Sequence, residues 1–283
     1  MVTSEPEARD AAPPEPPPDT ADDSPLPRTH PLRLADPFRW LSRGAADMAA
    51  NPGPSLFYGA CYAGMGWALA AVFRGAHEYT TTLTLGFLLL GPFLATGLYD
   101  LSRQRERGGR ARLLPSLVAW RANTAGLGLY VMVLTIIMLV WARASLVTFA
   151  LFFSRGLPTL TDFVSQVVSI RHIDFLLTYF GVGGFFAALV YAISAVSVPM
   201  MLDRSSDSIR ACFASVRALH DNPGPMLLWA ALIVLLIGIG FATAFVGLVI
   251  TAPLVGHATW HAYRAAIVAD PPPAVAPSTQ QPA

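Results

Sequence analysis

The sequence is poor in charge and in cysteine, and each shortage excludes a class of protein. Only 13% of its 283 residues are charged, against roughly 25% in globular domains, while 54% are hydrophobic. Two cysteines, Cys61 and Cys212, are too few for a disulfide framework or a cysteine-ligated metal site. The net charge of +1 gives no reason to expect nucleic acid as a partner. Because long uncharged runs recur, we predict an all-α, polytopic membrane helix bundle.

The motifs of common catalytic sites are also missing. The chain has no Gly-x-Ser-x-Gly elbow, no P-loop and no dinucleotide fingerprint. Charge is nearly absent from the predicted spans, apart from Arg143, whose side chain we expect to reach the headgroups from near a helix end. Since intramembrane charge usually marks ion or proton pathways, its scarcity weighs against a proton-coupled pump. We predict a non-enzymatic protein without a catalytic residue or a cofactor.

What the sequence does contain is one four-residue turn that is used twice. The copies are Asn51, Pro52, Gly53 and Pro54, and Asn222, Pro223, Gly224 and Pro225. Proline disfavours the α conformation in the residue before it, and Pro-Gly is typical of a type II turn. The second proline of each copy is expected at the first position of the next helix. Each copy is therefore predicted to join a surface-lying helix to a membrane-spanning one.

An amphipathic stretch precedes each turn. The apolar stripes consist of Phe38, Leu41, Ala45 and Met48, and of Ile209, Cys212, Phe213, Val216 and Leu219. The opposite faces carry Arg39, Arg43 and Asp47, and Arg210, Ala214, Arg217 and Asp221. Helices of this kind lie in the bilayer interface. Packing of a soluble helix on other loops is the alternative.

About six spans are expected from the apolar runs. They are predicted at residues 55–73, 80–99, 122–142 and 175–202, with two more within 226–263 that are joined near 238–244. One long tilted helix is the alternative for the last segment. Residues 145–153 either continue the third span or lie along the far surface, and 113–120 are expected to form another interfacial helix. Two small-residue pairs are expected at close helix contacts, namely Ala60 with Gly64 and Gly240 with Ala244.

The turns belong to a predicted internal repeat. Residues 36–103 and 205–264 share the order interfacial helix, turn, span, loop and span, with Pro92 aligned on Pro253. Residues 1–35, which are acidic and rich in proline, and residues 268–283 are expected to be disordered. The transmembrane domain is thus predicted to cover residues 36–267.

The arginines predict the orientation. If the N-terminus is cytoplasmic, the outer loops hold Arg74, Arg143, Arg155 and Arg171, and the other fifteen of the 19 basic residues lie inside. This bias predicts an inner-membrane protein with both ends in the cytoplasm, although a five-span chain would move only Arg264. The loop after the second span is expected to attract anionic lipids or simply to fix the orientation. Its arginines are Arg103, Arg105, Arg107, Arg110 and Arg112.

Few polar residues are candidates for a site. His257 and His261 lie one helical turn apart, a spacing at which two imidazoles can share a metal, but the sequence offers no third ligand. We interpret them as polar anchors at the membrane interface. Two charge pairs that close spans are expected to pair or to cap helix ends, namely Asp100 with Arg103 and Asp203 with Arg204.

Three blocks of the chain resemble a known family. They are residues 36–41 (DPFRWL), 199–204 (PMMLDR) and 253–264 (PLVGHATWHAYR). This combination resembles bacterial inner-membrane proteins grouped as domain of unknown function 2189, over about residues 30–267. The resemblance implies a multi-span integral membrane protein without an assigned activity. Some members carry a label as oxidase subunit I, but haem-copper oxidase subunits have about twice as many spans and histidines deep within them.

Three function hypotheses follow. The first is a protein that organises lipids or a membrane partner complex, motivated by interfacial helices and basic loops. The second is a small-solute permease, motivated by the repeated hairpins, which would need discontinuous helices around a polar cavity. The third is an accessory haem or metal subunit of a respiratory oxidase that uses His257 and His261.

Overall fold

A computed structural model describes residues 27–75, 80–152 and 173–268, which are helical apart from short connections and one isolated bridge between Thr29 and Ile267. The helices are α1 (Asp36–Ala50), α2 (Pro52–Gly75), α3 (Thr80–Glu106), α4 (Leu113–Leu117), the 3-10 helix η2 (Ala119–Asn123), α5 (Thr124–Phe152), α7 (Ile173–Ser194), α8 (Ser197–Arg204), α9 (Ser208–Asp221), α10 (Pro223–Ala242) and α11 (Leu248–Ala266). This content confirms the prediction of an all-α membrane bundle.

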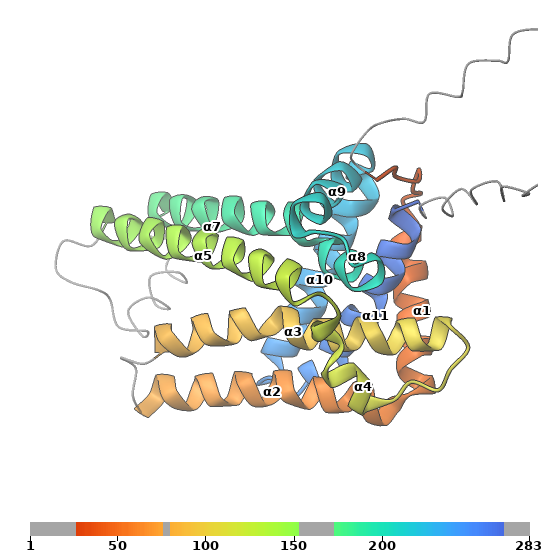
Figure 1. The fold of residues 1–283 in the computed structure, drawn as a ribbon. Helices are drawn as coiled ribbons and strands as arrows, with labels where there is room; N and C mark the ends of the chain where they lie inside the picture. Colours follow the sequence, from red (N-terminus) through yellow and green to blue (C-terminus); the bar gives the residue numbers. More distant parts are fainter. Residues whose placement is uncertain (1–26, 76–79, 153–172, 269–283) are drawn as a thin grey trace, which may run out of the picture.

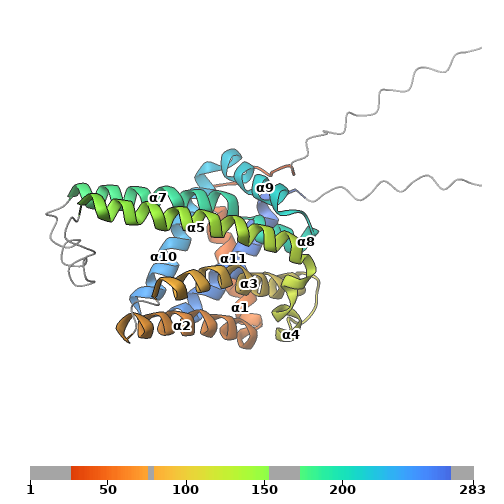
Figure 2. The ribbon, with the colours of Figure 1, turned by 60° about the vertical axis from the view of Figure 1, so that its left-hand side comes forward.

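The long helices are arranged as hairpins. Helix α2 packs beside α3 and α5 beside α7, and the α10–α11 pair lies between these two layers (Figures 1 and 2). The short helices α1, α4, α8 and α9 gather at one end of the long ones, on the right in Figure 1. The two expected repeats are therefore in direct contact, because α11 packs against both α2 and α3.

Four helical segments are long and apolar enough to cross a membrane. They are Pro52–Gly75, Ala119–Phe152, Ile173–Arg204 and Pro223–Ala242. They coincide with the first, third, fourth and fifth predicted spans. The other two predicted spans fall in α3 and α11, the helices that pack beside α2 and α10, so a total of six spans stays a prediction.

The structure resolves the two alternatives for residues 226–263 and 145–153, and it shows that one predicted span is interrupted. Residues 243–247 form a turn between α10 and α11, with positive φ angles at Ala244 (53°) and Phe245 (69°), so the alternative of one long helix is wrong. The indole N–H of Trp67 in α2 donates to the Ala244 carbonyl at 2.8 Å and ties this turn to the first repeat. The predicted fourth span is interrupted at residues 195–196, where α7 gives way to α8, and α5 continues to Phe152.

The two proline corners adopt one backbone conformation. Asn51 has φ −136° and ψ 62°, and Asn222 has φ −133° and ψ 57°. The next helix begins at the first proline of each copy, two residues earlier than expected, so the prediction of a type II turn is wrong. Both prolines fit within the first helical turn because the N–H groups there have no intrahelical acceptor. The first such bonds are donated by Ser55 to Asn51 at 3.3 Å and by Met226 to Asn222 at 3.1 Å.

The apolar stripes of α1 and α9 are exposed at some positions, while Leu41, Cys212 and Leu219 pack partly against the core. Phe38 is 56% exposed, and in α9 Ile209 and Phe213 are 60% and 54% exposed. The small residues of α9 pack inward instead, namely Ser208, Ala211, Ala214, Ser215 and Ala218. Exposed apolar positions beside candidate spans support the placement of both helices in the bilayer interface.

The two ends of the described chain lie together. The N–H of His30 donates to the Ala266 carbonyl at 2.9 Å, and the N–H of Val268 donates to the Arg28 carbonyl at 3.0 Å. The expectation of disorder up to residue 35 is therefore wrong for residues 27–35, whereas 1–26 and 269–283 lie outside the described residues. Because touching ends are expected on one side of a membrane, this contact favours an even number of crossings over five, and the number of spans stays a prediction.

Close helix contacts depend on other glycines than expected. A Cβ atom at Gly59 would overlap the backbone of Val249, and one at Gly66 would overlap Phe245. A Cβ at Gly240 would meet Leu248, as expected for a packing residue. Gly64 has open space around it, so the predicted contact at Ala60 and Gly64 is wrong. The face of α2 that packs on the second repeat is one helical position away from the predicted one.

Candidate functional site

A cavity of about 640 Å³ lies between the two repeats. Side chains of α2, α3, α10 and α11 and of the turn between the last two form its wall. The wall includes Met65, Phe87, Leu98, Ile237 and Val255, and its polar members are the hydroxyls of Tyr62, Thr84, Tyr99 and Thr259. Its size is that of ligand sites, which usually span about 300–1,000 Å³. The cavity suits a ligand that is itself almost entirely apolar.

The cavity opens on a surface that is expected to face lipid. Phe241, which lines it, is 56% exposed and belongs to α10, one of the four candidate spans. The opposite end is lined by Leu98, Tyr99 and Gly256, and Leu98 packs where a Cβ of Gly256 would lie. A molecule in the cavity is thus reached from the acyl region of the bilayer.

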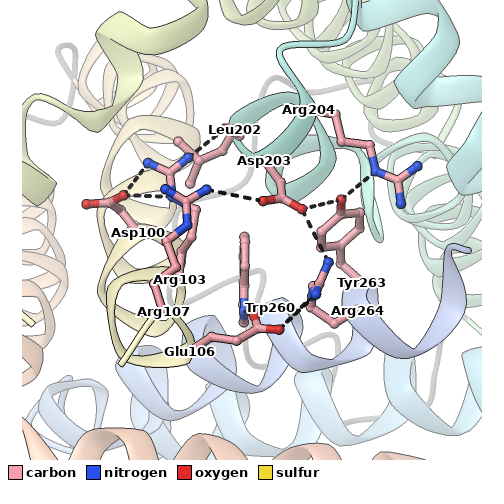
Figure 3. A network of polar contacts seen from close by, with 10 residues as sticks. All are labelled: Asp100, Arg103, Glu106, Arg107, Leu202, Asp203, Arg204, Trp260, Tyr263 and Arg264. Atoms are coloured by element: carbon pink, nitrogen blue, oxygen red, sulfur yellow. Dashed lines mark hydrogen bonds and ion pairs between the residues drawn. The ribbon is translucent and has the colours of Figure 1, made fainter. Parts of the chain in front are cut away.

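A network of charged side chains follows the last lining residues of α3 and α11, Tyr99 and Thr259, in the chain (Figure 3). We define the charged layer as Asp100, Arg103, Glu106, Arg107, Asp203, Arg204, Tyr263 and Arg264. The Arg103 guanidinium donates to Asp100 at 2.6 and 3.1 Å and to the Leu202 carbonyl at 2.8 Å, which joins α3 to α8. The expected pairing of Asp100 with Arg103 is thus present.

The second half of the charged layer joins α11 to its neighbours. The Tyr263 hydroxyl donates to Asp203 at 2.8 Å and accepts from Nε of Arg204 at 3.0 Å. Asp203 therefore reaches Arg204 through a phenol rather than directly, which corrects the expected pair. Glu106 of α3 accepts from the Trp260 indole and from Arg264, both at 2.9 Å (Figure 3). The layer joins the end of α3 to the ends of α8 and α11.

His257 is a buried core residue and not an interfacial anchor. It is 1% exposed, its Nε2 lies 2.9 Å from Ser55 Oγ and its Nδ1 lies 2.7 Å from Ser102 Oγ. His261, one turn further, contacts Asp47 of α1 through Nε2 at 2.9 Å. A metal shared by the two rings would displace Ser55 or Ser102 from His257, and it would reach His261 through Nδ1 if the contact with Asp47 is kept. Within residues 27–75, 80–152 and 173–268, no cluster of three or more metal-ligating side chains occurs.

Asp47 fixes the surface helix α1 to the bundle. Its carboxylate contacts His261 and lies 3.3 Å from Nη1 of Arg105, which also donates to the Ala46 carbonyl. Burial by itself raises the pKa of Asp47, but hydrogen bonding to His261 and Ser102 and the charges of His261 and His257 together outweigh it, so the pKa lies below its ordinary value of 3.8. Asp47 was expected on an exposed face with Arg43, and its burial corrects that prediction.

The five loop arginines divide into two groups. Arg103 and Arg105 make the internal contacts described above, which leaves them poorly placed to hold a lipid headgroup. Arg107 is 66% exposed, and its guanidinium makes a long contact of 4.0 Å with the Asp203 carboxylate. Arg110 and Arg112 are exposed. The sequence cannot separate these groups, because the partners of Arg103 and Arg105 lie on other helices.

Sequence reasoning missed the residues that build the cavity and the serine–histidine contact. Tyr99, Thr259, Ser55 and Ser102 are single polar residues in apolar runs, where nothing local distinguishes a lining residue from a packing one. A weak signal was present in the repeat alignment, which brought the ends of α3 and α11 into register. In the structure, these aligned helix ends lie where the lining of the cavity gives way to the charged layer.

The chain was compared with known proteins. Residues 80–203 match a family described as "Predicted integral membrane protein (DUF2189)", which confirms the resemblance for that part of the chain. No curated protein and no solved structure matches.

Proposed function

We propose that this chain, whose residues 80–203 match the family described as "Predicted integral membrane protein (DUF2189)", acts within the bilayer as a non-enzymatic lipid-binding protein. The cavity between the repeats is the observation that carries this proposal. It would hold an acyl chain between the hairpins α2–α3 and α10–α11, and so organise lipid around the bundle.

The chemistry of the wall supports an acyl chain over a polar solute. No charged side chain lines the cavity in the described part of the protein, and a buried polar ligand without partners costs several kcal/mol. An apolar void of this size left empty would forfeit the dispersion contacts of its wall. Lipid is the apolar molecule at highest local concentration beside α10.

The surroundings of the cavity support an anionic headgroup. The exposed part of the α9 stripe includes Phe213 and would keep acyl chains close to the protein. Arg107, Arg110 and Arg112 are exposed on the same end of the bundle as the charged layer. Each exposed basic residue near an anionic membrane surface contributes about 1 kcal/mol.

The test is a pair of glycine substitutions on α3. Gly91 lines the cavity and has open space where a side chain would start, so Gly91→Phe fills the cavity without displacing backbone. Gly86 lies on the same helix, is exposed, also has open space and does not line the cavity. Wild type and Gly86→Phe should retain lipid through detergent exchange, measured by mass spectrometry of the extract, and Gly91→Phe should lose most of it. Equal lipid in all three proteins would contradict the proposal.

The other two hypotheses receive less support. A small-solute permease was expected to show discontinuous helices and a polar cavity, but α3 and α11 continue through Pro92 and Pro253 and the cavity is apolar. A haem or metal subunit would use His257 and His261, whose nitrogens are engaged by Ser55, Ser102 and Asp47. We therefore retain lipid organisation as the proposed function.

A further inference from the structure

One hydroxyl in the cavity wall has no partner in the described protein. The Tyr62 hydroxyl donates to the Gly91 carbonyl at 3.2 Å, and the Thr259 hydroxyl donates to the Val255 carbonyl at 2.8 Å. Thr84 is also engaged. For the Tyr99 hydroxyl no hydrogen bond is found among residues 27–75, 80–152 and 173–268, although the side chain is only 9% exposed.

An unpartnered phenol in an apolar wall indicates a missing acceptor. An apolar wall that faces lipid offers a hydroxyl neither a protein acceptor nor water, and a donor without a partner in such surroundings costs about 1–3 kcal/mol. Phenylalanine would fill the same volume at this position without that cost. The phenol of Tyr99 is therefore best explained by an acceptor that the ligand brings.

The position of Tyr99 along the helix bundle indicates which chemical group of the ligand is the acceptor. Tyr99 is the last residue before the charged layer, which begins at Asp100, and it lines the cavity. It thus lies at the boundary between the apolar wall and the charged groups, where tyrosines of membrane proteins sit at the level of the lipid headgroups. At this depth a diacyl glycerolipid carries its ester carbonyls.

Resting on the proposed function, we propose that the ligand is a diacyl glycerolipid whose ester carbonyl accepts a hydrogen bond from the Tyr99 hydroxyl. The acyl chain then extends from the charged layer along the cavity toward Phe241 and the open side. Tyr99 acts as a specificity-determining residue, because the apolar wall alone cannot distinguish an ester lipid from a hydrocarbon or an ether lipid.

The test compares two lipids that differ only at the linkage. Full-length protein is reconstituted with equal amounts of diacyl phosphatidylglycerol and its dialkyl ether analogue with the same chains, and the bound lipids are counted by native mass spectrometry. A net hydrogen bond of ordinary strength predicts about fivefold preference of the wild-type protein for the ester lipid. In Tyr99→Phe this preference should fall to about onefold, with total lipid binding retained.

Tyr62→Phe is the matched control. It removes a cavity hydroxyl that already has a partner within the protein, so the ester preference should persist while the thermal midpoint of the lipid-free protein falls. Tyr99→Phe should leave that midpoint unchanged or higher, which also shows that the variant is folded. These opposite effects separate recognition of the ligand from packing.

The outcomes distinguish the two proposals. Wild type that binds both linkages equally, or Tyr99→Phe that keeps the preference, would overturn the assignment of Tyr99 and leave the acyl-chain cavity standing. Wild type that binds neither lipid, together with Gly91→Phe that changes nothing, would overturn the proposed function itself.

Discussion

At the scale of single residues, the two corner asparagines show how one local geometry can serve two purposes. Asn51 and Asn222 have nearly the same φ and ψ. The side chain of Asn222 accepts from the N–H of Leu32 at 2.7 Å and donates to the His30 carbonyl at 3.1 Å. The side chain of Asn51 makes only a long contact of 3.5 Å with the Asp47 carbonyl. The second corner therefore also anchors the N-terminal segment.

We expect Asn222→Ala to destabilise the protein more than Asn51→Ala. The first change leaves two backbone groups of residues 30 and 32 unpartnered, at a cost of about 1–3 kcal/mol, while the second removes one weak contact. Thermal unfolding in detergent, followed by tryptophan fluorescence, gives the two midpoints. A larger shift for Asn51→Ala would mean that the corner itself, and not the anchored segment, is the source of the stability.

At the scale of helices, the contact between α2 and α11 depends on the absence of a side chain. Gly59 packs directly on the backbone of Val249, and Ala63, one turn on, is fully buried. This contact holds the hairpin of α2 and α3 against α11. Close approach of this kind is usual between membrane helices, where packing replaces the hydrophobic effect.

Gly59→Ala is expected to lower the stability of the bundle by about 1–3 kcal/mol, because the new methyl group would overlap backbone that cannot move aside easily. Gly64→Ala is the control on the same helix, and with open space around it we expect no loss, or a gain of up to about 1 kcal/mol. Differential scanning fluorimetry of both proteins decides the matter. Equal midpoints would contradict the packing of α2 on α11.

The surface helix α1 should respond to acid through Asp47. The folded pKa of this carboxyl lies below its ordinary value of 3.8, so its contribution to stability is complete above about pH 4 and is lost as the pH falls through the folded value. Asp47→Asn should cost about 1–3 kcal/mol at pH 7, and less as the pH falls below 4. Asp36→Asn, which affects the ion pair with the 63% exposed Arg39, should cost less than about 1 kcal/mol.

Midpoints measured from pH 7 to pH 3 for wild type and both variants provide the test. A difference between wild type and Asp47→Asn that stays constant down to pH 3 would show that Asp47 does not titrate in this range. The contacts of Asp47 with His261 and Arg105 would then stabilise α1 by another route than charge.

Sequence reasoning predicted helices better than their faces. Uncharged runs placed the helices because length and hydropathy are local properties. The sequence-based prediction placed the packing face of α2 at Ala60 and Gly64 instead of Gly59, and it placed Asp47 at the surface. Both errors have one cause, which is that the partner of each residue lies on α11, about 200 positions away in the chain.

At the scale of the whole molecule, the bridge between Thr29 and Ile267 brings the two ends of the described chain together, and we expect both on one side of the membrane. The arginine distribution predicts that this side is the cytoplasm. Neither observation depends on the other, so a labelling experiment can test them separately.

We expect cysteines introduced as Ser24→Cys and Ser278→Cys, in a chain with Cys61→Ala and Cys212→Ala, to be protected from an impermeant maleimide in intact cells. Both should react once the membrane is opened. Ala76→Cys, in the predicted outer loop, should react in intact cells and serves as the control. Reaction of only one terminal cysteine would contradict the even number of crossings, and reaction of both would reverse the orientation.

The cavity is the part of the molecule that the sequence could not reveal. Its wall is made of residues that also occur in any spanning helix, and it exists only because the two hairpins meet without filling the space between them. The charged residues beyond it were visible in the sequence, but their pairing across α3, α8 and α11 was not. A three-dimensional arrangement of ordinary residues therefore carries the proposed function.

The side opening near Phe241 has a consequence for how occupancy must be measured. A ligand that enters from the acyl region never passes through water, so the fraction of protein that is occupied follows the mole fraction of that lipid in the bilayer and not its aqueous concentration. Diluting the membrane with a non-binding lipid should empty the cavity, whereas diluting the sample with buffer should leave it filled.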